Sequence, residues 1–132
     1  MSYAGQPVPS EEQQVTRAKI SDGKSVKVVV PENTTIEAQQ FYLLGGFFGV
    51  AAQAVTTGEG QTDEVTLTIE QAEYETDNIV TTELFNQGDK IYWDNTAKKF
   101  TVTEGTNRLV GRVTQPKDSN NVIWFILLPQ YA

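Results

Sequence analysis

The 132-residue sequence contains no cysteine and no histidine. Without cysteine there is no disulfide scaffold and no thiol nucleophile, and without histidine the usual acid/base group of hydrolases is missing. The two absences together remove the ligands of most zinc sites. Long apolar runs are also missing, because the longest, residues 122–128, has only seven residues and cannot span a bilayer. We therefore expect no enzyme activity, no metal or cofactor, no secretory leader and no membrane partner.

Basic residues are scarce as well. Ten lysines and arginines stand against seventeen aspartates and glutamates, which gives a formal net charge of −7. Because phosphate backbones are bound by basic patches, this balance argues against nucleic acid as a partner. Residues 28–89 carry eleven acidic and no basic groups, whereas residues 90–132 carry six basic and three acidic groups. This asymmetry suits assembly of copies head to tail or side by side, although a solvated acidic face is the simpler interpretation.

Two regions differ in pattern. Residues 1–14 (MSYAGQPVPSEEQQ) have no periodicity and hold two of the five prolines, which predicts a flexible or extended arm outside the core. Residues 15–132 consist of strand-length apolar segments separated by turn signals, which predicts a single all-β domain. The spacing is typical of a small antiparallel sandwich or barrel, jelly-roll-like in outline.

Individual segments indicate where the strands lie. An Asp22-Gly23 pair between residues 15–20 and 25–30 predicts a hairpin. Gly45-Gly46 interrupts the apolar stretch from residue 38 to 52 and argues against one continuous helix. Residues 64–70 alternate as a half-buried strand, and the apolar phase then slips near Glu70-Gln71, where we expect a bulge or bend. Later turns are expected at residues 86–89, 95–98, 104–107 and 116–121.

Some patterns also suggest chemistry, and each has a simpler explanation. Residues 18–25 satisfy a relaxed phosphate-loop pattern, but a β run follows where a helix is required, so a plain hairpin is favoured. Glu73, Glu75 and Asp77 recur at period two and would line one strand face. They lack the loop of a calcium motif, so a solvated acidic row is the simpler interpretation. Carboxylate pairs for glycoside hydrolysis occur in any acidic domain, and nothing singles one out.

Aromatic residues mark two strands. Tyr92 and Trp93 are adjacent and must point to opposite faces, so we expect one ring in the core and the other at a subunit interface. The alternative is that an exposed ring stacks on a carbohydrate or on single-stranded nucleic acid. Residues 122–128, which include Trp124, are apolar on both faces and predict a central or sandwiched strand. An exposed apolar edge would recruit other chains, so we expect this strand to be covered, and the protein to be a homodimer or homotrimer.

Three blocks, taken together, resemble a known family: FYLLGGFFGVA at residues 41–51, NQGDKIYWD at residues 86–94, and residues 98–112 with Gly111. Their order is similar to that in the capsid decoration, or cement, proteins of tailed phages, small head proteins often labelled as predicted recombinases. The resemblance covers roughly residues 26–114. The recombinase label has no support in these residues, because such an ATPase needs a strand–loop–helix nucleotide core.

The resemblance implies an all-β, oligomeric, structural protein on the outer surface of the assembled head, present in the host cytoplasm before assembly. It also implies that the partners are the major capsid protein and further copies of the chain. The arm can lie extended along a partner at low ordering cost, because its prolines already restrict the backbone. The residues expected at capsid or oligomer interfaces are Tyr3, Pro7, Val8, Pro9, Tyr92, Trp93 and Trp124. A non-enzymatic module that binds carbohydrate or single-stranded nucleic acid through the aromatic strand is the alternative.

Overall fold

The computed structural model describes residues 18–130, and these form eleven strands and no helix. All paired strands are antiparallel, so the predicted all-β class is confirmed. Within the same residues no helix of a length and hydrophobicity that would cross a membrane is found.

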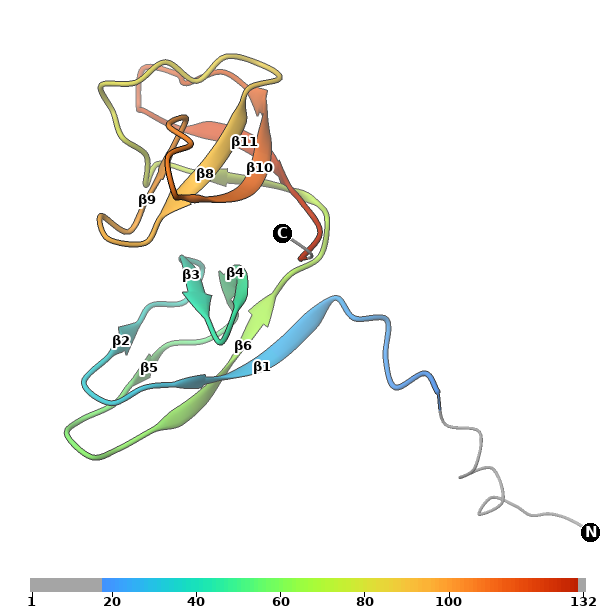
Figure 1. The fold of residues 1–132 in the computed structure, drawn as a ribbon, viewed down its shortest axis with the longest axis vertical. Helices are drawn as coiled ribbons and strands as arrows, with labels where there is room; N and C mark the ends of the chain where they lie inside the picture. Colours follow the sequence, from blue (N-terminus) through green and yellow to red (C-terminus); the bar gives the residue numbers. More distant parts are fainter. Residues whose placement is uncertain (1–17, 131–132) are drawn as a thin grey trace, which may run out of the picture.

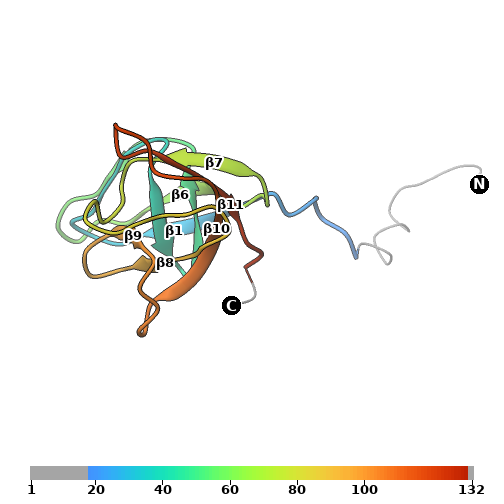
Figure 2. The ribbon, with the colours of Figure 1, turned by 90° about the horizontal axis from the view of Figure 1, so that it is seen from above.

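The strands form two main sheets and a short ribbon (Figure 1). The N-terminal sheet has the order β1 (Ser25–Val30), β6 (Asp63–Thr68), β4 (Phe47–Ala51), β3 (Phe41–Leu44). The C-terminal sheet has the order β7 (Glu73–Thr76), β11 (Ile123–Leu127), β10 (Arg108–Gln115), β8 (Lys90–Asp94), β9 (Lys99–Thr101). The ribbon pairs β2 (Thr35–Ile36) with β5 (Val55–Thr56). Seen from above, the two main sheets overlap as layers (Figure 2).

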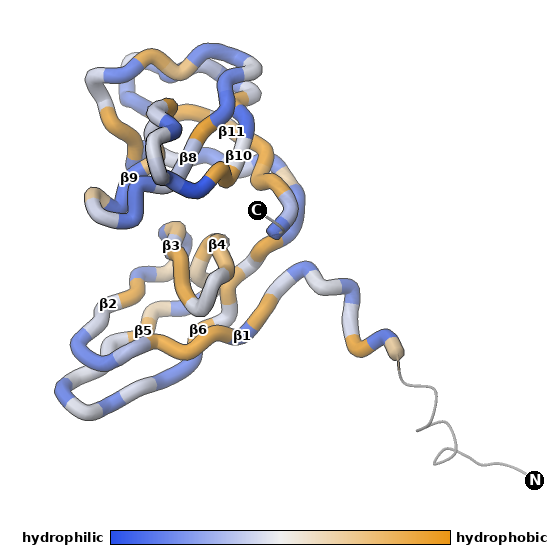
Figure 3. Tube along the Cα trace, in the orientation of Figure 1, coloured by the Kyte–Doolittle hydropathy of each residue, from blue (hydrophilic) through white to orange (hydrophobic). Residues whose placement is uncertain are grey.

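The β3–β4 hairpin lies between the two halves of the molecule. Its turn is Gly45-Gly46, with φ values of 58° and 84°, and a two-residue hairpin of this kind needs positive φ at both positions. The interpretation of the glycines as a break between two strands is therefore confirmed. Side chains alternate across a strand, so each hairpin strand has one face toward each half. The tube coloured by hydropathy shows both strands as largely apolar (Figure 3).

The larger core cluster joins one face of the hairpin to the C-terminal sheet. Phe100, fully buried on β9, has its ring centroid 5.3 Å from that of Phe41 and 5.7 Å from that of Phe48. It lies equally close to C-terminal rings, 5.2 Å from Trp93 and 5.0 Å from Phe125. Several of these rings meet edge to face, a geometry worth about 0.5–1.5 kcal/mol per pair beyond their burial. The aromatic cluster therefore fastens the two sheets together.

The smaller core cluster lies on the other side of the hairpin, inside the curl of the N-terminal sheet. Its buried members come from β1, β2, β4 and β6: Val28, Val30, Ile36, Ala51, Val65 and Leu67. Tyr42, Leu44 and Phe47 of the hairpin pack against them. The alternation that the sequence predicts for residues 64–70 is confirmed, because Val65 and Leu67 are buried here.

A polar tie also joins the hairpin to the C-terminal sheet. The Gln130 side chain accepts a hydrogen bond from the Phe48 amide and donates one to the Phe48 carbonyl, both at 2.9 Å. Arg108 donates to the Gly46 carbonyl at 2.6 Å and to Gln130 Oε1 at 3.1 Å. Partial burial lowers the pKa of Arg108 from its ordinary value. The free backbone groups of the hairpin are thus satisfied by residues far away in the sequence.

One of the local predictions is wrong. The expected hairpin of residues 15–20 and 25–30 does not form, since β1 pairs with β6 and residues 18–24 contain no strand before Ser25. Gly23 has the positive φ (68°) that the turn signal indicated, but its turn leads into a strand paired elsewhere. The bulge or bend expected near Glu70-Gln71 is confirmed as a bend: β6 ends at Thr68, the chain bends at Gln71, and it crosses to the other sheet, where β7 begins at Glu73.

The apolar strand β11 is paired on both edges, by β7 and β10, so its predicted interior position in a sheet is confirmed. Within one chain, however, only one of its two faces is covered. Ile123, Phe125 and Leu127 are buried, whereas Trp124 and Ile126 are 45% and 37% exposed. Pairing alone protects the backbone edge, and it leaves an apolar face in contact with solvent.

The close approach of β4 to β6 gives a stability prediction. A Cβ at Gly49 would overlap the Thr68 carbonyl oxygen and lie 3.0 Å from the Ile69 side chain. We expect Gly49→Ala to lower the free energy of unfolding by about 1–3 kcal/mol, as overpacking does. In Gly58→Ala the added Cβ meets only the flexible Gln61 side chain, so that control should lose less. Urea unfolding followed by tryptophan fluorescence compares the two, and equal midpoints would contradict the steric account.

The polar tie gives a second stability prediction. Gln130→Ala leaves the Phe48 amide and carbonyl without their partner in a half-buried position, which should cost about 1–3 kcal/mol of unfolding free energy. Gln87→Ala is the matched control, because Gln87 makes one exposed hydrogen bond of 3.3 Å, to the Thr114 carbonyl. Thermal unfolding of both variants tests this, and a Gln130→Ala melting temperature equal to that of the control would rule out the tie.

Candidate functional site

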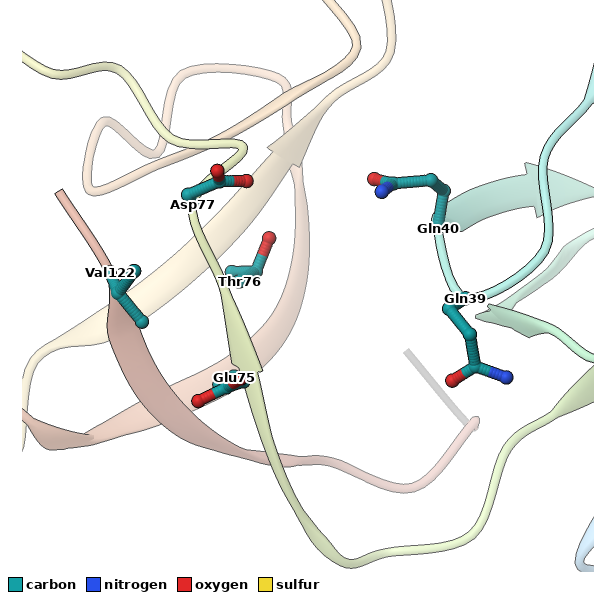
Figure 4. A pocket seen from close by; sticks show the side chains of 6 residues that line it. All are labelled: Gln39, Gln40, Glu75, Thr76, Asp77 and Val122. Carbon is teal, nitrogen blue, oxygen red and sulfur yellow. The ribbon is translucent and has the colours of Figure 1, made fainter. Parts of the chain in front are cut away.

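An open polar groove lies where the start of β3 faces the end of β7. Figure 4 shows Gln39 and Gln40 on one side and Glu75, Thr76 and Asp77 on the other. In the described residues 18–130 no group of three acidic side chains is placed to hold a metal ion. The period-two acids are divided between β7, which carries Glu73 and Glu75, and the segment after it, which carries Asp77.

A second hollow adjoins this groove, and its polar groups bind one another. The Asn78 side chain donates to the Lys98 carbonyl at 2.8 Å and accepts from Lys99 Nζ at 3.4 Å. The Tyr42 hydroxyl accepts a hydrogen bond from the Glu37 amide at 2.8 Å. The Asn78 contacts fix the loop after β7 against the β8–β9 turn, and the Tyr42 contact fixes the segment between β2 and β3, so both have a structural role.

The aromatic pair of β8 is almost inaccessible. Trp93 is 2% exposed, packs in the larger cluster, and donates its indole N–H to Asn95 at 3.0 Å. Tyr92, outside that cluster, is only 9% exposed. The expectation that one of these rings is open to a partner is therefore wrong for this structure. The carbohydrate or nucleic-acid alternative depended on such a ring, and β8 does not offer one.

Exposed side chains of mixed character cover the face of the C-terminal sheet that points away from the larger cluster, here called the outer face. Its defining residues are Glu73, Glu75, Lys90, Arg112, Trp124 and Ile126. The strand register aligns four of them in one row across the sheet, in the order Glu73, Ile126, Arg112, Lys90. A second row places Glu75 next to Trp124. The outer face thus has an acidic border on β7, an apolar centre on β11 and a basic border on β10 and β8.

Local contacts hold the acidic border in place. Glu73 accepts a hydrogen bond of 2.5 Å from the Thr114 hydroxyl on β10, so its side chain reaches across β11. Beneath it, Tyr74 points into the core and donates its hydroxyl proton to the Glu70 carbonyl at 2.8 Å. Burial raises the pKa of Tyr74, and the charge of Glu70 raises it further. The phenol therefore stays protonated and continues to donate at neutral pH.

A second exposed region lies at the edge strand β1. Ile20 is 86% exposed and Val29 is 58% exposed. Two ion pairs are found here, Lys19–Asp22 at 3.0 Å and Lys24–Glu70 at 3.6 Å. Both pairs are largely solvent-exposed, and such pairs contribute little to stability.

The predicted interface residues have different outcomes. Tyr3, Pro7, Val8 and Pro9 lie outside the described residues. Trp124 is exposed on the outer face, as an interface residue must be. Sequence reasoning missed Ile126, Glu73 and Arg112 as its neighbours. Alternation along residues 122–128 contained the signal for Ile126, but the pairing of β11 with β7, some fifty residues earlier, is not visible in the sequence.

Comparison with known proteins adds independent information. Residues 20–130 match the model of a family described as phage cement protein. Among solved structures, the chain is similar to the N base of head fiber gp8.5 in bacteriophage phi29, with 11% identity and a TM-score of 0.45, covering 79% of this chain and 94% of that one. No curated protein matches the sequence. Because the family match spans nearly the whole described region, the chain belongs to the phage cement protein family and is a structural protein of the bacteriophage capsid.

Proposed function

We propose that this protein binds the outside of the assembled phage head and stabilises the lattice of the major capsid protein. The observation that carries the proposal is the family match over residues 20–130, which includes both sheets and both core clusters. The geometry is compatible with it: the two grooves described above are open and polar, and the Asn78 and Tyr42 side chains of the second are already hydrogen-bonded within the chain. A protein of this kind acts through its surfaces and its rigidity.

Mass action explains how such binding stabilises a shell. A ligand that binds the assembled lattice and not its free subunits shifts the equilibrium toward the lattice by RT ln(1 + [L]/Kd) for each site. Each contact can therefore be modest, because a capsid repeats the same junction many times. Before assembly the protein is in the host cytoplasm, and copies of it associate with one another as a homodimer or homotrimer.

The proposed latch onto the major capsid protein is the arm of residues 1–14. Tyr3, Pro7, Val8 and Pro9 give it an apolar and backbone-restricted character that suits an extended path along a partner. None of the core contacts described above needs this segment. The acidic stretch of residues 28–89 offers a second, electrostatic mode of contact.

Deleting residues 1–14 separates attachment from folding. We expect the melting temperature to stay within about a degree or two, as for a segment outside the core. Binding to undecorated capsids, measured by co-sedimentation at low and high salt, should fall. A full-length variant with Tyr3, Pro7, Val8 and Pro9 all changed to serine keeps the length and charge of the arm and should show the same loss.

The salt series distinguishes the two contact modes. Residual binding of the truncated protein that disappears at high salt would indicate the acidic stretch, since exposed charges are screened there. If truncation and the serine variant bind as the intact protein does at both salt concentrations, the arm is not the latch.

A further inference from the structure

We propose that the outer face of the C-terminal sheet is a homotypic interface, through which two copies of the protein pack face to face about a two-fold axis. This deepens the self-association named in the proposed function by identifying its surface and symmetry. The starting observation is an apolar centre that the fold leaves uncovered. Trp124 is 45% exposed and Ile126 37% exposed, although both belong to a strand paired on its two edges. Tryptophan and arginine, both present here, are the residues most enriched at interface hot spots.

The charges on either side of this centre indicate that the binding partner is a second copy of the chain. Glu73 and Glu75 of β7 border it on one side, and Arg112 of β10 and Lys90 of β8 border it on the other. Within the part of the chain that the structure describes, neither Arg112 nor Lys90 forms an ion pair. The outer face therefore presents an acidic and a basic border, which is the condition for complementarity to itself.

The strand register determines which symmetry axis fits. Glu73, Ile126 and Arg112 form one row across the sheet, perpendicular to β11. A two-fold axis in the interface and parallel to β11 exchanges the two ends of this row. Glu73 of one copy then faces Arg112 of the other, and Ile126 and Trp124 meet their own counterparts. An in-plane axis perpendicular to β11 would instead bring acidic borders together and basic borders together, which is unfavourable.

Sheet edges are poorer candidates for the same contact. The free edge of the C-terminal sheet on this side is β7, and pairing two copies of β7 would place Glu73 and Glu75 beside the same residues of the second copy. Charged side chains at an edge are a common protection against such pairing. The face is thus favoured over the edge, and two sheets packed face to face with aligned strands are a common arrangement.

Single charge reversals test the pairing between copies. In sedimentation velocity of the full chain, Glu73→Lys and Arg112→Glu should each weaken dimerisation at least about tenfold, because each places like charges opposite one another. An equimolar mixture of the two variants should restore the dimer, since Lys at position 73 of one chain then faces Glu at position 112 of the other. Only a contact between chains gives rescue by mixing, which separates the proposal from charge effects within one chain.

Removing the apolar centre is the second arm of the test. Trp124→Ser should reduce dimerisation by at least about tenfold, whereas Leu84→Ser, which removes a side chain that is 73% exposed in a loop, should not. Urea unfolding confirms that the variants are folded. A wild-type protein that stays monomeric at high micromolar concentration, or a mixture of charge variants that does not associate, would overturn the proposal. Capsid co-sedimentation of Trp124→Ser distinguishes the dimer interface from capsid attachment. If this variant is monomeric and still binds capsids, Trp124 is needed for the dimer, and attachment does not depend on dimerisation.

Discussion

The structure depends on one constraint: the β3–β4 hairpin must be apolar on both faces, because it is the wall shared by two cores. Phe41 and Phe48 enter the aromatic cluster of the C-terminal sheet, while Tyr42 and Phe47 cover the smaller cluster inside the curled N-terminal sheet. Every other strand contributes a side chain to one of these two clusters. The Gly45-Gly46 turn and the contacts from Arg108 and Gln130 keep the hairpin in register with both. Loss of the hairpin would separate the two sheets and not merely loosen one.

A rigid interior of this kind leaves function to the surface. Several residues that carry the family resemblance have internal, structural roles: Phe48 and Trp93 are buried in the larger cluster, and two glycines allow strands to approach closely. Gly49 allows β4 to approach the Thr68 carbonyl, and Gly111 allows β10 to approach β11, where a Cβ would lie 2.9 Å from the Ile126 carbonyl oxygen. The family pattern therefore reflects how the sheets pack. It does not identify the contacts with other proteins, which have to be sought among exposed residues such as Trp124 and in the arm.

Local patterns in the sequence predicted much of the fold. Contacts between segments that are distant in the sequence could not be predicted in this way. The alternation of Val65 and Leu67 and the glycine pair at 45–46 are properties of a few neighbouring residues, and both predictions hold. Asp22-Gly23 is an equally strong local signal, yet β1 pairs with β6 some forty residues later. Likewise, Trp93 is buried because the β3–β4 hairpin places Phe48 against it, with the two ring centroids 5.0 Å apart. Nothing near Trp93 in the sequence indicates this cover. The expectation that one ring of the pair lies in the core holds for Trp93, whereas the other ring, Tyr92, is only 9% exposed and is not open to a partner as expected.

The central claim is that the protein stabilises an assembled head, and the most direct measurement is the temperature at which heads release their DNA. Heads lacking the protein are heated with a DNA-binding dye, alone and with increasing amounts of purified protein. We predict that the release temperature rises with protein concentration and reaches a plateau as the sites fill, as linkage requires. Bovine serum albumin at the same concentrations controls for crowding. A release temperature that does not change, while co-sedimentation shows the sites to be occupied, would contradict the account.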